Sequence, residues 1–110
     1  TIIGPGRLAQ WYVDEGGQVI RFGKPLPNAF TGALAMLGKP EPARYLMVGD
    51  SLFHDIAGAV GAGLGSLLIT QGIHRKSLHN ISDDKRGEAL AKVAAPTGVM
   101  PDYVMPSFIW

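Results

Sequence analysis

Two short apolar runs constrain the fold of this chain more than any other feature. The first, Tyr45–Val48, is closed by Gly49-Asp50, and the second covers Ser66–Thr70. Unbroken apolar runs of this length are typical of strands buried on both faces of a parallel sheet. Residues 53–62, between them, predict a helix whose small side chains and glycines are best explained by close packing against that sheet.

The elements around this unit extend the alternation of helices and strands. Pro5 opens a short predicted helix that stops at Gly16-Gly17, because early proline and late glycine punctuate helices. We further predict a strand over residues 18–22, helices over 27–37 and 83–95, and an edge strand over 103–105. Strands that alternate with helices in this way indicate an α/β fold with a parallel sheet.

The composition excludes several classes of protein. The net charge is +1 and the basic residues are scattered, so nothing points to a nucleic acid or an anionic membrane as partner. The chain has no cysteine, which excludes disulfides and thiolate chemistry and fits a cytoplasmic protein. No apolar run approaches the roughly 18 residues of a transmembrane helix, and the N-terminal residues do not form a signal peptide.

Charged residues make up 17% of the chain and apolar residues 46%. Soluble domains carry roughly 25% charged residues. We therefore expect part of the apolar surface to be covered by a partner chain or by sequence outside these residues. The chain starts at Thr1 without a methionine, and we expect it to be a fragment or a processed product.

The strongest signal for chemistry is the run G-D-S-L-F-H-D from Gly49 to Asp55. Asp50 falls at the carboxyl end of a predicted strand, where open α/β sheets place their ligands. Asp55 falls in the first turn of the helix that follows. Two carboxylates in one crevice suit a hard cation such as Mg²⁺, and a helix N-terminus nearby favours a phosphate. Both residues could equally be helix caps, since aspartate is common there.

Lys24, in the sequence Gly23-Lys24-Pro25, favours the metal and phosphate interpretation over the capping one. A phosphoryl-transfer site needs a fixed positive charge to hold the phosphate. Because Lys24 lies between a predicted strand and a predicted helix start, its amine could reach the same crevice as Asp50. Alone it would be an ordinary solvated lysine; its combination with G-D-x-x-x-x-D is far more specific.

The joint pattern resembles the haloacid dehalogenase (HAD) superfamily, and most of all its class IIA, NagD-like branch. The order helix, G-G, strand, G-K-P, helix, strand with G-D-S, helix, A-G, strand and T-x-G-I-H is matched over roughly residues 5–75. The resemblance implies a Rossmann-like, three-layer α/β fold, a parallel sheet with flanking helices that is here an incomplete core. It also implies a phosphatase that hydrolyses a small phosphorylated metabolite with Mg²⁺ as cofactor.

The resemblance also implies a role for each matched position. Lys24 would be the catalytic, phosphate-binding lysine. Asp50 would be a direct magnesium ligand, and Asp55 would hold the metal shell through water or by orienting its neighbours. Gly49 and Ser51 lie in the metal loop and would support the ligands.

The chain departs from the family at the nucleophile. The family uses a D-x-D motif directly after its first core strand, and this sequence contains no D-x-D. We therefore expect a C-terminal part only, with residues 1–22 as the end of the cap domain or its junction to the core and 23–110 as the C-terminal part of the core. Alone it would be inactive. Tyr45–Val48 would have a bare edge, to be covered by the missing N-terminal part of the same protein or by a second copy.

Two alternatives stay open at this stage. His74 follows the carboxyl end of a predicted strand and could contact substrate, or it could have a plain loop role. The whole chain could also be a non-enzymatic α/β module that binds metal or protein, with Asp50 and Asp55 as metal ligands or caps. Such a module would be a stable monomer without an exposed sheet edge.

Overall fold

The computed structural model describes residues 3–38 and 41–109, and a parallel three-stranded sheet lies at its centre. The strands β1 (Leu46–Gly49), β2 (Gly65–Ile69) and β3 (Tyr103–Met105) stand in the order β1-β2-β3. In register, Val48 pairs with Leu67, and Leu67 pairs with Tyr103. The predicted parallel sheet is confirmed, and both strands expected from the apolar runs lie within it.

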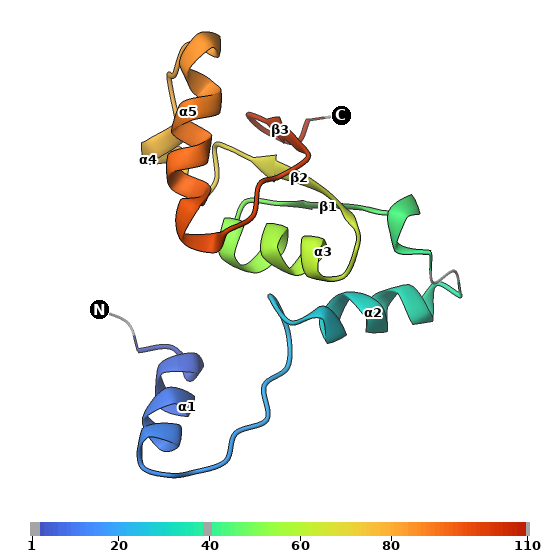
Figure 1. Cartoon of the computed structure of the whole chain (residues 1–110). Coiled ribbons are helices and arrows are strands. Elements are labelled where there is room, and N and C mark those ends of the chain that lie inside the picture. The colour runs from blue at the N-terminus through green and yellow to red at the C-terminus, as the bar shows by residue number, and fades with distance from the viewer. Residues whose placement is uncertain (1–2, 39–40, 110) are drawn as a thin grey trace.

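Helices precede, connect and follow these strands (Figure 1). The predicted helices over 27–37 and 83–95 are confirmed, whereas the short α4 was not predicted. The elements are α1 (Pro5–Asp14), α2 (Pro27–Met36), a 3-10 turn η1 (Pro42–Arg44), a π-helical turn η2 (Leu52–Ile56), α3 (Ala57–Gly61), α4 (Arg75–Leu78), α5 (Asp83–Ala94) and a 3-10 turn η3 (Ala95–Thr97). None of the helices among the described residues is long and apolar enough to cross a membrane.

The hydrophobic core lies on one face of the sheet. Leu68 of β2 is fully buried and belongs to one cluster with Leu52 and Ile56 of η2 and with Leu90 of α5. Both β-α-β connections move in the same direction along the sheet, and right-handed crossovers then put their helices on the same face. The elements η2, α4 and α5, which contribute to this cluster, thus lie on this face of the sheet.

The opposite face of the sheet carries a row of apolar side chains, none of which is buried. Alternation along each strand and the strand register assign these residues to that face. The row consists of Leu46, Val48, Leu67, Ile69, Tyr103 and Met105. A parallel sheet normally has both faces covered, so this face has the composition of an interface.

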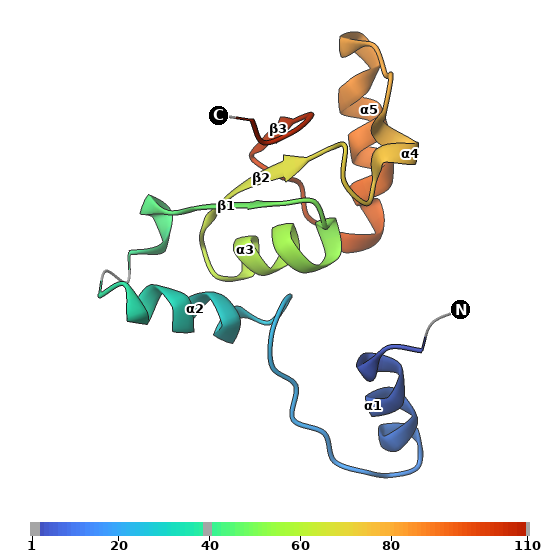
Figure 2. The ribbon, with the colours of Figure 1, turned by 180° about the vertical axis from the view of Figure 1, so that it is seen from behind.

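The predicted strand over residues 18–22 is wrong. These residues form no strand in the structure, and Ile20 and Phe22 are 84% and 80% exposed. The sheet ends at β1, so the segment has no neighbour with which to exchange backbone hydrogen bonds. It runs as an extended connection to α1, which has no buried residue and stands apart from the sheet in both views (Figures 1 and 2).

A polar clip ties β3 to β2 at the amino ends of the strands. The fully buried Ser66 donates from its backbone N–H and its hydroxyl to the Asp102 carboxylate, at 2.8 and 2.9 Å. In return the Asp102 N–H donates to the Ser66 hydroxyl at 3.1 Å. The clip fixes where β3 begins, although the two residues are far apart in the sequence.

We expect Ser66→Ala to lower the free energy of unfolding by about 1–3 kcal/mol, because it removes the fully buried hydroxyl that donates to the charged Asp102 carboxylate and accepts from the Asp102 N–H. Ser77→Ala, at an exposed position of α4, is the matched control and should stay within about 0.5 kcal/mol of wild type. Urea denaturation measures both. Equal effects of the two substitutions would show that the clip contributes nothing.

Candidate active site

Asp50 lies directly after the carboxyl end of β1, as predicted. Its Oδ2 accepts a hydrogen bond from the Ile73 N–H at 3.0 Å, and Ile73 belongs to the loop that follows β2. A Cβ at Gly72 would overlap the Asp50 side chain, so the loop can lie this close only with glycine at that position. The second loop thus orients a carboxylate that the first loop supplies.

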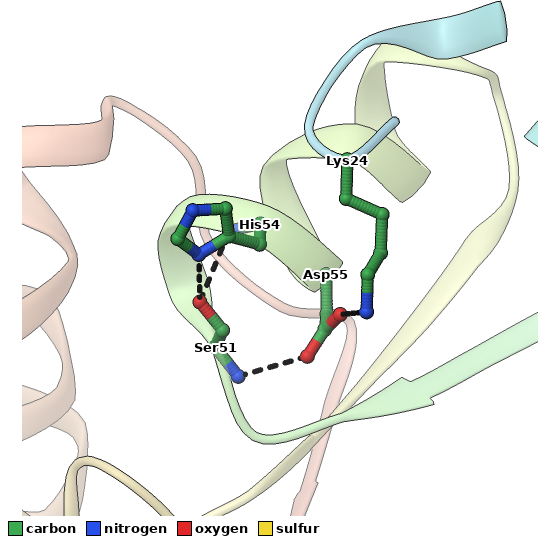
Figure 3. A network of polar contacts seen from close by, with 4 residues as sticks. All are labelled: Lys24, Ser51, His54 and Asp55. Atoms are coloured by element: carbon green, nitrogen blue, oxygen red, sulfur yellow. Dashed lines mark hydrogen bonds and ion pairs between the residues drawn. The ribbon is translucent and has the colours of Figure 1, made fainter. Parts of the chain in front are cut away.

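Asp55 is the centre of a second set of contacts, shown in Figure 3. The Lys24 Nζ lies 2.6 Å from Asp55 Oδ1, and the Ser51 N–H donates to Oδ2 at 3.1 Å. The Asp55 side chain is 6% exposed, whereas that of Lys24 is 49% exposed. About half of the Lys24 side chain is therefore open to the solvent, while one proton of its ammonium group is held by the buried carboxylate.

The pKa of Asp55 reflects this environment. Burial has the largest single effect and raises the pKa. The hydrogen bond from Lys24, the Ser51 backbone hydrogen bond, the Lys24 charge and a backbone hydrogen bond from Asp50 all lower it, and together they outweigh burial. The pKa of Asp55 therefore lies below its ordinary value, and the residue is an anion at neutral pH.

This direction predicts a pH dependence of stability. Since the pKa of Asp55 is lower in the folded than in the unfolded chain, ionised Asp55 stabilises the fold above about pH 4, and the contribution is lost as the pH falls through the folded-state pKa. The stability difference between wild type and Asp55→Asn should thus be larger at pH 6 than at pH 3. Urea denaturation at both pH values tests this, with Glu88→Gln, at an exposed position beyond the first turn of α5, as control. A difference that does not change with pH would contradict it.

The chain enters the helix after Asp50 through a π-helical turn. The Ile56 N–H donates to the Ser51 carbonyl at 3.0 Å, and the Ser51 hydroxyl accepts from the His54 N–H at 3.1 Å. We predicted an ordinary helix from Phe53, so the π-helical turn η2 is a difference from expectation. Single π-turns are rare and frequent at functional sites. Here the turn carries Asp55 into the core and towards Lys24, and leaves His54 exposed.

Gly49 leaves the space that Asp55 occupies. A Cβ at position 49 would overlap the Asp55 side chain, which Lys24 and Ser51 hold from both sides. We expect Gly49→Ala to destabilise the protein by about 1–3 kcal/mol, as overpacking does. Gly87→Ala is the matched control: a Cβ there meets open space on α5, so it should stabilise by about 0.5–1 kcal/mol. Thermal or urea unfolding of both variants gives the answer; the same sign for both would contradict the expectation.

The structure brings most of the predicted residues to one edge of the sheet. Hydrogen bonds join Asp55 to Lys24 and to Ser51. Asp50 directly follows β1 and precedes Ser51. His74 is not free in a loop: its Nε2 accepts from the Leu52 N–H at 3.2 Å, so it holds the turn after Asp50. The sequence reasoning missed Gly72 and Ile73 as supports of Asp50, although the T-x-G-I-H pattern contains both.

Few side chains at this site could serve as ligands to a metal ion. Among residues 3–38 and 41–109 there is no group of three or more acidic, histidine or cysteine side chains that could hold a metal ion. Both Asp55 oxygens accept hydrogen bonds, and one Asp50 oxygen does. This leaves Asp50 as the better placed carboxylate for a cation. One or two carboxylates fit Mg²⁺, which keeps several waters when bound to protein.

This fold is that of HAD-like hydrolases. The chain belongs to the HAD-hydrolase-like family, whose model matches residues 21–108. It is 46% identical over 86 residues to the phospholysine phosphohistidine inorganic pyrophosphate phosphatase of Xenopus laevis, a match that covers 77% of this chain and 28% of that protein. The resemblance in sequence therefore extends to a phosphatase.

Solved structures give the same result for the fold. The p-nitrophenyl phosphatase from Archaeoglobus fulgidus superposes with a TM-score of 0.65 at 22% identity, over 93% of this chain and 35% of that one. NagD from Escherichia coli gives 0.63 at 21% identity, over 93% and 34%. A possible sugar phosphatase of the HAD superfamily from Cytophaga hutchinsonii gives 0.64 at 30% identity, over 93% and 33%. The chain thus spans about a third of the length of the proteins it resembles.

Proposed function

We propose that this chain supplies the phosphate- and metal-binding part of a Mg²⁺-dependent phosphatase that acts on small phosphate compounds. The observation that carries the proposal is the pairing of Lys24 with Asp55 beside Asp50, across a long separation in the sequence. A mere helix cap would not need a lysine from another element. The Lys24 side chain is half exposed, and its ammonium has donors left for an anion while Asp55 fixes its position.

Each residue would have a distinct task in this site. Asp50 would hold Mg²⁺, which when bound supplies positive charge to the phosphate. Asp55 would act through Lys24 and the Ser51 amide, and would keep both in place without itself leaving the core. Lys24 would bind a phosphate oxygen and offset its charge. Gly49 and Ser51 would shape the loop, and His74 would hold it through the Leu52 N–H, as a support and not as a substrate contact.

The attacking group would come from outside these residues, since the sequence contains no D-x-D motif. We propose that it arrives on a strand that pairs with β1, and that residues 1–22 are the end of a cap domain while 23–110 belong to the core. The apolar outer face of the sheet supports this arrangement. So does an apolar groove of about 300 Å³ between α2 and β1, lined in part by Phe30, Leu34 and Met47. A second copy of the chain is the other candidate for this surface.

The substrate class is proposed from the relatives. Their names include phospholysine, phosphohistidine, inorganic pyrophosphate and p-nitrophenyl phosphate as compounds on which those proteins act. We propose a small phosphorylated metabolite of this kind, hydrolysed in the cytoplasm. The identity of 46% favours pyrophosphate and phosphoramidate substrates as the first to assay.

The test is hydrolysis of inorganic pyrophosphate and p-nitrophenyl phosphate by the polypeptide at its natural length, with Mg²⁺ and with Mg²⁺ chelated. We expect turnover that requires Mg²⁺. The 110-residue chain, assayed in parallel, should show none. Turnover without divalent metal, or no turnover of any phosphate compound by the natural-length protein, would refute the proposal. A stable and inactive monomer of 110 residues would favour the non-enzymatic module instead.

A further inference from the structure

A second cavity lies at the carboxyl ends of β2 and β3, where the segment between α4 and α5 passes over them. Its volume is about 210 Å³, and none of the residues assigned to the phosphatase site lines it. The polar part of its wall consists of Thr70, Gln71, His79, Asn80 and Arg86. No carboxylate is among its lining residues. One guanidinium among polar groups, with no carboxylate in the lining, is an environment for an anion.

Arg86 has the capacity to bind such an anion. Its Nη2 donates to the Asp83 carboxylate at 2.7 Å, but the Asp83 side chain is 90% exposed. Exposed pairs of this kind on one helix are weak. Because a guanidinium carries five N–H donors in a planar fork, Arg86 retains donors for a second acceptor. A carboxylate matches that fork in shape and charge, as a phosphate does.

The rest of the wall is apolar. Leu78 of α4 and Val104 and Met105 of β3 line this part of the cavity. A water molecule occupies about 30 Å³, so 210 Å³ holds roughly seven heavy atoms. This is below the roughly 300 Å³ at which sites for larger ligands begin. The occupant must therefore be small, with a short apolar body.

We propose that this cavity binds a small organic carboxylate, with its carboxylate group on Arg86 and its apolar body against Leu78, Val104 and Met105. Asn80 has a left-handed backbone with φ of 54°, and it turns the connection between α4 and α5 over the cavity. The site is separate from Lys24 and does not depend on the proposed phosphatase function.

Isothermal titration calorimetry of the natural-length polypeptide with isovalerate, a carboxylate of seven heavy atoms, tests the proposal. We expect binding in the millimolar range, weakened at least tenfold by Arg86→Gln. Lys85→Gln is the matched control, since Lys85 is the exposed basic neighbour outside the lining, and it should change affinity less than twofold. The uncharged 3-methylbutan-1-ol should bind at least tenfold more weakly than isovalerate. That comparison needs no variant, so it holds even if Arg86→Gln fails to fold.

Three results would overturn the proposal. The first is no heat from isovalerate at any concentration up to tens of millimolar. The second is binding that persists in Arg86→Gln but is lost in Lys24→Met, which would place the carboxylate at Lys24. The third is inorganic phosphate that binds as tightly as isovalerate and is weakened by Arg86→Gln, which would make the ligand an inorganic anion.

Discussion

Asp50→Asn in the natural-length polypeptide is expected to lower Mg²⁺-dependent phosphate hydrolysis by at least about 100-fold. Asparagine has the shape of aspartate but no charge, so a cation that Asp50 holds would lose its anionic ligand. Changes that merely orient a metal ligand already cost about 10–100-fold, and loss of the ligand itself should exceed them. The Ile73 N–H can still donate to the asparagine oxygen, so the fold should remain intact.

The control for this substitution is Asp84→Asn, which makes the same chemical change at an exposed position of α5. Its activity should stay within about twofold of wild type, as for a surface position away from special features. The Mg²⁺ concentration needed for half-maximal activity should rise in Asp50→Asn alone. If Asp50→Asn hydrolyses phosphate as fast as wild type at the same Mg²⁺ concentration, Asp50 is no metal ligand.

Lys24→Met is expected to lower the hydrolysis rate by about 100- to 1,000-fold, the range seen when one donor that stabilises transition-state charge is removed. Methionine keeps much of the apolar length of lysine, so the packing of the stem changes little. The substitution also leaves the buried Asp55 carboxylate without its cationic partner. The pKa of Asp55 should therefore rise, because burial would then act with less opposition.

Lys92→Met, at an exposed position of α5, is the matched control and should retain wild-type activity. Lys24→Arg separates charge from shape: it restores the positive charge near Asp55 and should recover stability more than activity. Steady-state kinetics and urea denaturation of the three variants give both quantities. Wild-type turnover by Lys24→Met would remove the lysine from the phosphate site.

The strands and the functional motif were readable from the sequence because their signals are local. Tyr45–Val48 is apolar throughout, and the Gly49-Asp50 that follows it ends the apolar run. Lys24 could be assigned to the same predicted site because its combination with the G-D-x-x-x-x-D motif resembles the HAD superfamily. The structure then joins Lys24 to Asp55 by a short ion pair. The assignment of Asp50 and Asp55 to a metal stays a prediction.

Features that depend on distant partners were not readable. The residues around Ile20 are mostly apolar and β-branched or aromatic, as in a strand, but no neighbouring strand for them exists within the described sheet. The π-helical turn η2 differs from an ordinary helix by one residue per hydrogen bond, and its sequence carries no mark of this. Likewise the clip between Ser66 and Asp102 joins residues with no detectable pattern between them. For residues 18–22 and for the clip, the deciding contact lies outside the window that a local pattern covers; for η2 the contacts are local, but no sequence signal marks them.

The position of β1 at the end of the sheet has a consequence for control of the proposed activity. The residues that would bind phosphate lie at the end of β1, beside its unpaired edge. The group that would attack the phosphate would lie on the strand that pairs with this edge. Hydrolysis would then require that the two parts of the protein associate, and neither part would be active alone. An incompletely synthesised or cleaved protein would have no phosphatase activity, because one of the two parts of the site would be missing. A polypeptide divided near α2 could therefore serve as a split reporter. Hydrolysis of an aryl phosphate to its yellow product would show that the two halves had associated.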